Sequence, residues 1–131
     1  LHNYSGKRVV SIEEARLSYI NYLAARYYKE SNGITIKLLH IGSRRFRLIL
    51  KSENPRSLKE GKVVEVKELE SGYNYRFMCP IYSIDYIPTN YEMVVIDFNK
   101  VQKLSHLKFN YIMKPEEVVL EIKKALLAYN L

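Results

Sequence analysis

Apolar residues recur at helical spacing near both ends of the chain. Ser11 and Glu14 fit a capping box and Asn32-Gly33 fits a helix stop, so this stretch predicts a helix over about 12–31. Its expected buried stripe is Leu17, Ile20, Leu23, Ala24 and Tyr27. Pro115 suits the first position of a C-terminal helix. The expected buried stripe of that helix is Val118, Val119, Ile122, Ala125, Leu126 and Tyr129.

Between these stretches apolar and polar positions alternate, which predicts three β-hairpins. Their strands are expected at 34–41 with 44–51, at 62–69 with 73–79, and at 81–87 with 91–98. Residues 93–96 are apolar without a break, which is typical of a strand covered on both faces. Within residues 99–113, Val101, Leu104 and Leu107 fit one short helix, and Phe109, Tyr111 and Met113 alternate like an edge strand.

The register of the first hairpin follows from the separation of apolar and charged residues. A three-residue loop over 42–44 segregates them better than a two-residue turn at Gly42-Ser43. The expected apolar face then holds Ile34, Ile36, Leu38, Phe46, Leu48 and Leu50. The expected polar face holds Thr35, Lys37, Arg45, Arg47 and Lys51.

These elements predict an α+β fold in a single domain over residues 1–131, with residues 1–10 loosely ordered. The expected architecture is a mainly antiparallel sheet of about five or six strands built from hairpins, with an N-terminal and a C-terminal helix packed on it. The length of 131 residues fits one domain with its own core.

The distribution of charge adds a function class to this fold. The formal net charge is +7, and residues 1–59 hold 12 Lys/Arg against 4 Asp/Glu, while residues 60–131 hold 9 against 10. Such asymmetry favours an anionic partner, nucleic acid first. The candidate nucleic-acid-binding residues are Lys37, Arg44, Arg45, Arg47, Lys51, Arg56 and Lys59. The alternative for this basic face is a solvated outer surface of the sheet.

Tyrosine is unusually frequent, with 12 residues, and tryptophan is absent. Tyr22 and Tyr28 fall off the expected stripe of the first helix, and Tyr73 and Tyr75 lie beside the expected second turn. Exposed tyrosines suit protein interfaces or stack on unpaired bases, whereas buried ones fill a core. We therefore take these four residues as candidate interface residues.

The sequence offers little for catalysis. Glu65-x-Lys67 resembles the core of metal-dependent nucleases of the PD-(D/E)xK type, which implies a carboxylate on Mg²⁺ and a lysine at the nucleophile, provided that Asp85 and Asp97 converge with Glu65. No Asp precedes position 65, and a hairpin is expected after the motif where that family needs a helix. His2, His40 and His106 have no ligand spacing, and Cys79 suits a small buried hydrophobe. We predict no catalytic residue, metal or cofactor.

The favoured function is a small non-enzymatic module that binds DNA or RNA through the cationic hairpin face. The alternative is a structural or interaction protein that self-associates into a homo-oligomer, through tyrosines and edge strands such as 108–113, in a viral or accessory assembly. A metal-dependent nuclease is the minor alternative.

No membrane partner is expected, because no apolar run spans a bilayer. The single cysteine and the lack of a signal-like stretch favour an intracellular, cytoplasmic or virion-associated protein. Many Lys, Glu and Ile with a single Gln resemble hyperthermophile proteins, archaeal or viral.

Overall fold

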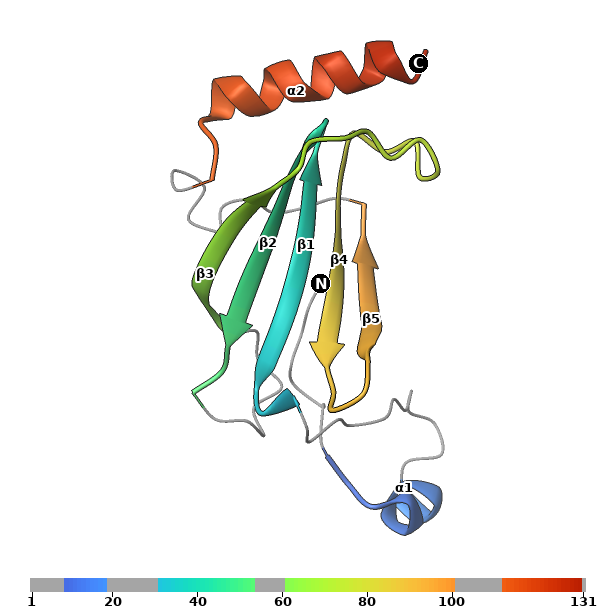
Figure 1. Cartoon of the computed structure of the whole chain (residues 1–131). Coiled ribbons are helices and arrows are strands. Elements are labelled where there is room, and N and C mark those ends of the chain that lie inside the picture. The colour runs from blue at the N-terminus through green and yellow to red at the C-terminus, as the bar shows by residue number, and fades with distance from the viewer. Residues whose placement is uncertain (1–8, 19–30, 54–60, 101–111, 131) are drawn as a thin grey trace.

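The alternating stretches form one sheet, and the helical stretches flank it in sequence. The computed structural model describes residues 9–18, 31–53, 61–100 and 112–130. The elements are α1 (Ile12–Ser18), β1 (Ile34–Ile41), β2 (Arg44–Lys51), β3 (Lys62–Leu69), β4 (Ile81–Pro88), β5 (Met93–Asn99) and α2 (Pro115–Ala128). The fold is therefore α+β, as predicted, and the described residues form one antiparallel sheet of five strands in the order β3-β2-β1-β4-β5 (Figure 1).

The first and third predicted hairpins are confirmed, as β1–β2 and β4–β5. The second is wrong, because β3 pairs with β2 and residues 73–79 form no strand. The chain between β3 and β4 instead passes the β1–β2 turn, where Gly72 N donates to Ser43 O and Gly42 N donates to Pro80 O. This segment, residues 70–80, is called the crossover below.

The expected register of the β1–β2 hairpin is also wrong. Ile41 pairs with Arg44, so the loop is the two-residue turn Gly42-Ser43. Gly42 has φ +61° and Ser43 does not have a positive φ, which fits a type II′ turn with glycine in its first central position. Turn geometry thus outweighs the separation of apolar from charged residues, and every side chain of β1 changes face relative to β2.

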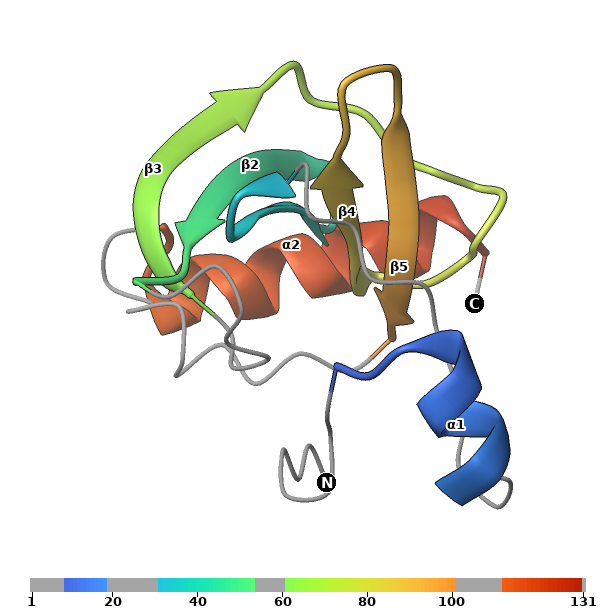
Figure 2. The same ribbon diagram turned by 90° about the horizontal axis from the view of Figure 1, so that it is seen from below.

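This register defines two faces of the sheet. The face with Leu39, Ile41, Phe46, Leu48 and Leu50 is the core face, where all five side chains are buried. Ile112, Met113 and Val118 complete its hydrophobic cluster. The opposite, outer face carries His40, Arg45, Arg47, Tyr82 and Tyr86. The strands curve strongly, and α2 lies on their concave side (Figure 2).

Helix α2 begins at Pro115, as predicted, and the backbone N–H of Lys114 donates to the Glu117 carboxylate at 3.1 Å. The helix lies across the end of the sheet beside the β1–β2 turn (Figure 1). Val118, Ala125 and Tyr129 are buried, as the stripe predicts. Val119 is 53% exposed, so its place on the stripe is wrong.

Helix α1 begins where the capping box predicts, since Glu14 N donates to the Ser11 hydroxyl at 3.2 Å. Leu17 is 85% exposed and is no core residue, because α1 lies away from the core at the opposite end of the sheet from α2 (Figure 1). The rest of the predicted stripe, from Ile20 to Tyr27, lies outside the described residues, as do residues 101–111.

Strand β5 also differs from its prediction. Met93, Val95 and Ile96 are each about half exposed, so the strand is not covered on both faces. It is the last strand on its side of the described sheet. Within the described ranges no helix is both long and apolar enough to cross a membrane.

Candidate functional site

The seven predicted nucleic-acid-binding cations do not share one face. Arg45, Arg47 and Lys51 lie on the outer face, where their partners across β1 are His40, Leu38 and Ile34. Lys37 and Arg44 lie on the core face, opposite Leu48 and Ile41. Arg56 and Lys59 lie outside the described residues. The two-residue turn is the cause of this division, because it shifts β1 by one residue relative to β2.

Lys37 is buried among core residues and holds a structural ion pair. Its Nζ lies 3.3 Å from Oδ1 of Asp85, and the two side chains are only 7% and 14% exposed. Asp85 is the direct cross-strand partner of Lys37 on β4. A buried ammonium is tolerated only when a carboxylate or equivalent group compensates it. Lys37 is therefore unable to reach a phosphate without breaking the core.

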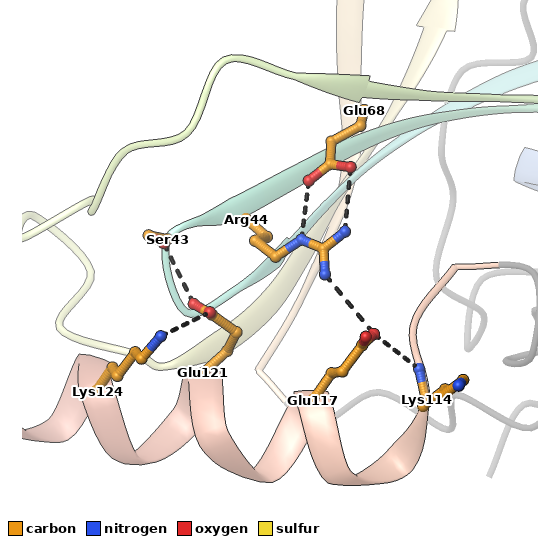
Figure 3. A network of polar contacts seen from close by, with 7 residues as sticks. All are labelled: Ser43, Arg44, Glu68, Lys114, Glu117, Glu121 and Lys124. Carbon is orange, nitrogen blue, oxygen red and sulfur yellow. Dashed lines mark hydrogen bonds and ion pairs between the residues drawn. The ribbon is translucent and has the colours of Figure 1, made fainter.

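Arg44 forms ion pairs with two carboxylates at the end of the sheet (Figure 3). Its guanidinium donates to both carboxylate oxygens of Glu68, at 2.8 and 3.1 Å, and lies 3.8 Å from Glu117 of α2. These contacts raise the pKa of Arg44 and lower that of Glu68, the mutual hydrogen bonds being the main cause. Arg44 joins β2, β3 and α2, which is a structural role.

The outer face of β2 and β3 carries a strip of five cations, called here the cationic strip: Arg45, Arg47, Lys51, Lys62 and Lys67. The register places Arg47 directly opposite Lys67, and Lys51 directly opposite Lys62. Glu65 is the one carboxylate that the described strands β2 and β3 themselves place on this face, and it lies 3.1 Å from Arg47. Lys62 reaches Glu53 at 3.1 Å, with both side chains more than four-fifths exposed. Like charges directly opposite one another destabilise a sheet, so the strip concentrates positive charge at a cost in stability.

A pocket of about 320 Å³ adjoins one end of the cationic strip. One wall is the row that Arg45, His40 and Tyr82 form across β2, β1 and β4. The next rows add Leu38, Ile84 and Tyr86. The crossover residues Gly72, Tyr73 and Asn74 complete the lining.

Several polar atoms of the residues that line the pocket are buried. His40 and Tyr82 are 8% and 1% exposed, and their rings stack at 4.3 Å between centroids. His40 Nδ1 and Arg45 Nε are buried and form no hydrogen bond with the described part of the chain. The buried Tyr82 hydroxyl forms none that meets strict geometry, although the Asn74 side chain is near enough to act on it as a hydrogen-bond partner. Burial, and secondarily the charge of Arg45, lowers the pKa of His40 to about 4, so the imidazole is neutral at pH 7. Burial raises the pKa of Tyr82, and Asn74 offsets only part of this effect.

The predicted interface tyrosines of the crossover, Tyr73 and Tyr75, pack around Tyr129 of α2, with ring centroids 6.0 and 5.4 Å from its ring. Tyr75 remains 58% exposed, and Tyr73 lines the pocket. Tyr22 and Tyr28 lie outside the described residues.

The groups that a nuclease of the resembled type needs do not converge. Glu65 and Lys67 lie on the outer face of β3, whereas Asp85 and Asp97 oppose each other on the core face of β4 and β5. β2 and β1 separate the two pairs. No group of three His, Cys, Asp or Glu among the residues that the structure describes could hold a metal ion.

The sequence did not predict the pocket. It is built by the β1–β4 pairing and by the crossover. The pattern of apolar and polar residues did not predict that β1 pairs with β4, and it placed residues 73–79 of the crossover in a strand. Frequent tyrosine was the one signal that pointed toward it. In comparisons with known protein families, curated proteins and solved structures, the chain matches none.

Proposed function

We propose that the protein binds single-stranded nucleic acid, without catalysis, on the outer face of its sheet. The observation that carries the proposal is two like-charged cross-strand pairs, Arg47 opposite Lys67 and Lys51 opposite Lys62. A fold gains nothing from such neighbours, and a polyanion laid along β2 and β3 relieves their repulsion. The core-face cations Lys37 and Arg44 have no part in this surface.

The surroundings of the cationic strip favour single strands over duplexes. Leu38, Ile84 and Tyr86 are partly exposed on the adjoining outer face, and Tyr73 stands over it from the crossover. Aromatic and apolar side chains beside a cationic groove suit unpaired bases, which stack on them, whereas a duplex keeps its bases stacked internally. Phosphates would contact the strip, and bases would lie toward β1 and β4.

The test is fluorescence anisotropy of labelled single-stranded DNA, single-stranded RNA and duplex DNA, between 50 and 300 mM salt. The double variant Arg47→Gln/Lys67→Gln removes two contacts of the cationic strip. Each lost phosphate contact lowers the slope of log K against log salt by about 0.7 for single strands, which amounts to about 25-fold weaker binding for two contacts at 0.1 M salt.

The matched control is Lys123→Gln/Lys124→Gln on α2, which removes the same charge from exposed positions away from the outer face. We expect the control to bind nearly as the wild type does. Equal weakening of both variants would mean that binding follows net charge alone, and no binding at 50 mM salt would reject the proposed function.

Self-association is the second candidate, and β5 favours it. Val95 and Ile96 are 57% and 47% exposed on the last described strand of that side, and an exposed apolar edge pairs readily with another copy. Sedimentation velocity without nucleic acid tests it. A concentration-dependent mass that Val95→Lys abolishes would support assembly, and a monomer at all concentrations would reject it.

A further inference from the structure

Helix α2 carries apolar side chains on the side that faces away from the sheet (Figure 1). Val118 and Ala125 are buried, whereas Leu120 and Leu127 are 51% and 76% exposed. An α-helix has 3.6 residues per turn, so residues three, four and seven positions apart share one side of it. The side opposite the buried residues, called here the distal face of α2, consists of the exposed residues Glu116, Val119, Leu120, Lys123 and Leu127.

The distal face also holds one acidic and one basic residue without a partner in the chain. Glu116 and Lys123 are seven positions apart, which separates them by two turns, or about 10.5 Å, along the helix. Neither side chain forms an ion pair with another residue that the structure describes. The residues that follow them, Glu117 and Lys124, differ in this respect, because both take part in the polar contacts beside the sheet (Figure 3).

A second copy of the chain is the occupant whose charges complement this face. The midpoint between Glu116 and Lys123 lies between Val119 and Leu120. When two copies of α2 pack antiparallel about a two-fold axis at that midpoint, each Glu116 lies opposite Lys123 of the other copy. The same axis brings the exposed Val119 and Leu120 of the two copies together. A parallel pair would instead place like charges opposite one another, which is unfavourable.

We propose that the protein forms a homodimer through antiparallel packing of the distal faces of two α2 helices. This surface is separate from β5 and from the outer face of the sheet, and the proposal does not depend on nucleic-acid binding. The helix has 14 residues and is about 21 Å long, so the contact buries less than the roughly 1,200 Å² of a stable interface. We therefore expect a weak dimer, with a dissociation constant in the micromolar range.

The outer face stays accessible in such a dimer. α2 lies on the concave side of the curved sheet, whereas the cationic strip lies on the opposite face (Figure 2). Dimerisation therefore changes the mass of the protein and leaves the contacts of each copy to a short single strand unchanged. Neutralising Lys123 should weaken the dimer without weakening the binding of a strand that contacts one copy.

The first experiment measures the dimer by sedimentation velocity without nucleic acid, from micromolar to sub-millimolar protein at low salt. Glu116→Lys replaces the two attractive contacts across the axis by two repulsive ones. An exposed ion pair changes affinity by up to about fivefold, so the loss of two should weaken the dimer roughly 30-fold. The charge exchange Glu116→Lys/Lys123→Glu restores opposite charges across the antiparallel contact and should recover most of the affinity.

The matched control is Glu13→Lys on α1. Glu13 is the second residue of α1 and Glu116 is the second residue of α2, so both variants change the net charge and the charge at a helix N-terminus in the same way. Glu13→Lys should leave the dimer unchanged, and far-UV circular dichroism checks that every variant folds. Equal weakening by Glu13→Lys and Glu116→Lys would overturn the proposal, because dimerisation would then follow net charge alone.

The second experiment uses the wild-type protein. A zero-length carbodiimide cross-linker joins a carboxylate to an amine only where the two groups touch. In an equal mixture of ¹⁴N- and ¹⁵N-labelled chains, mass spectrometry should find a peptide pair that links Glu116 of one isotope to Lys123 of the other. Absence of this link between chains, at concentrations where a dimer is present, would overturn the antiparallel contact.

The outcomes distinguish this dimer from the other candidate assemblies. A dimer that Val95→Lys abolishes and Glu116→Lys leaves intact would place the contact on β5 and overturn the α2 proposal. A dimer that Glu116→Lys weakens and the charge exchange does not restore would overturn the antiparallel arrangement. A monomer at all concentrations would reject the dimer, and strand binding that Arg47→Gln/Lys67→Gln weakens would still stand.

Discussion

Arg44 and Arg45 are neighbours in the chain, yet they meet opposite environments. The Arg44 guanidinium lies on the core face between two carboxylates and holds β2 to β3 and α2 (Figure 3). Arg45 lies on the outer face and lines the pocket. Its Nε is buried without a hydrogen-bond partner among the described residues, and its Nη1 donates one long hydrogen bond, 3.5 Å, to Glu70 O. Strand alternation alone separates the two side chains.

The same contrast extends over both faces. On the core face, Lys37 and Arg44 each have a carboxylate placed against them. On the outer face, Arg47 faces Lys67 and Lys51 faces Lys62, and the carboxylates beside Arg47 and Lys62, from Glu65 and Glu53, are at least half exposed. Charge on the core face therefore serves stability, whereas charge on the outer face costs stability and is suited to binding an anion. Substitutions that remove one charge from each face should separate these roles.

The largest effect is expected from Asp85→Ala. It leaves the Lys37 ammonium buried without its carboxylate, and breaking a buried pair in this way lowers the free energy of unfolding by about 3–5 kcal/mol. Urea denaturation measures it. Glu65→Ala removes the carboxylate partner of Arg47, and the side chains of this pair are 36% (Arg47) and 51% (Glu65) exposed. It should therefore lower the free energy of unfolding by no more than about 1 kcal/mol.

The double variant Lys37→Met/Asp85→Leu is the control for the buried pair. It removes both charges together, so most of the stability should return. Equal losses for Asp85→Ala and Glu65→Ala would show that Lys37 reaches water, and the contrast between the two faces would be wrong.

A second test compares two glycines. Gly42 has φ +61°, and a Cβ there would lie 2.5 Å from the carbonyl oxygen of Glu121 in α2. Gly42→Ala should therefore lower stability by about 2–4 kcal/mol, from the left-handed backbone and from the overlap with α2. Gly72, in the crossover, has nothing within 4 Å of such a Cβ. Gly72→Ala should leave the urea midpoint nearly unchanged, and equal losses would mean that α2 does not pack on the turn.

The sequence predicted elements well and their relative placement poorly. The strands of two hairpins and the start of α2 are confirmed, because local periodicity, turn residues and caps determine them. The second hairpin failed, because alternation over 73–79 arises from aromatic residues that pack on Tyr129 and Tyr82 from an irregular crossover. Short apolar alternation does not distinguish these two cases.

The candidate site was predicted in part. Arg45, Arg47 and Lys51 do share a face, but Lys37 and Arg44 do not belong with them. The prediction required each face to be uniform, and the structure places a lysine in the core because Asp85, 48 positions further along the chain, compensates it. Lys62 and Lys67 were not predicted as part of this surface, because only the β2–β3 register places them beside Lys51 and Arg47, and that register depends on tertiary structure.

A pH dependence tests the pocket side of the comparison. The pKa of His40 is about 4 in the folded protein and near 6.5 unfolded, because burial and the facing Arg45 disfavour its protonation. The unfolded chain therefore binds the extra proton first, and stability is lost as the pH falls from about 6.5 toward 4. Between pH 8 and pH 5 this loss should be about 2 kcal/mol.

The control for this loss is His40→Phe, which keeps a ring against Tyr82 but has no titrating group. The stability difference between wild type and variant, measured by urea denaturation from pH 8 to pH 4.5, isolates His40 from the carboxylates. A difference that stays constant with pH would show that the imidazole is solvated and that this side of the pocket is not buried.

The smallest expected effect has the opposite sign to the others. Arg47→Gln/Lys67→Gln removes a like-charged cross-strand pair, so stability should stay level or rise by about 0.2–1 kcal/mol, less what Glu65 loses as the partner of Arg47. Arg44→Gln, on the core face, should lower it. Salt sharpens the difference: 0.5 M NaCl screens the repulsion on the outer face and should stabilise the wild type more than the double variant in thermal denaturation. A double variant that is clearly less stable than the wild type at low salt would mean that the cationic strip is held together by contacts of its own, and the observation that carries the proposed nucleic-acid surface would then be lost.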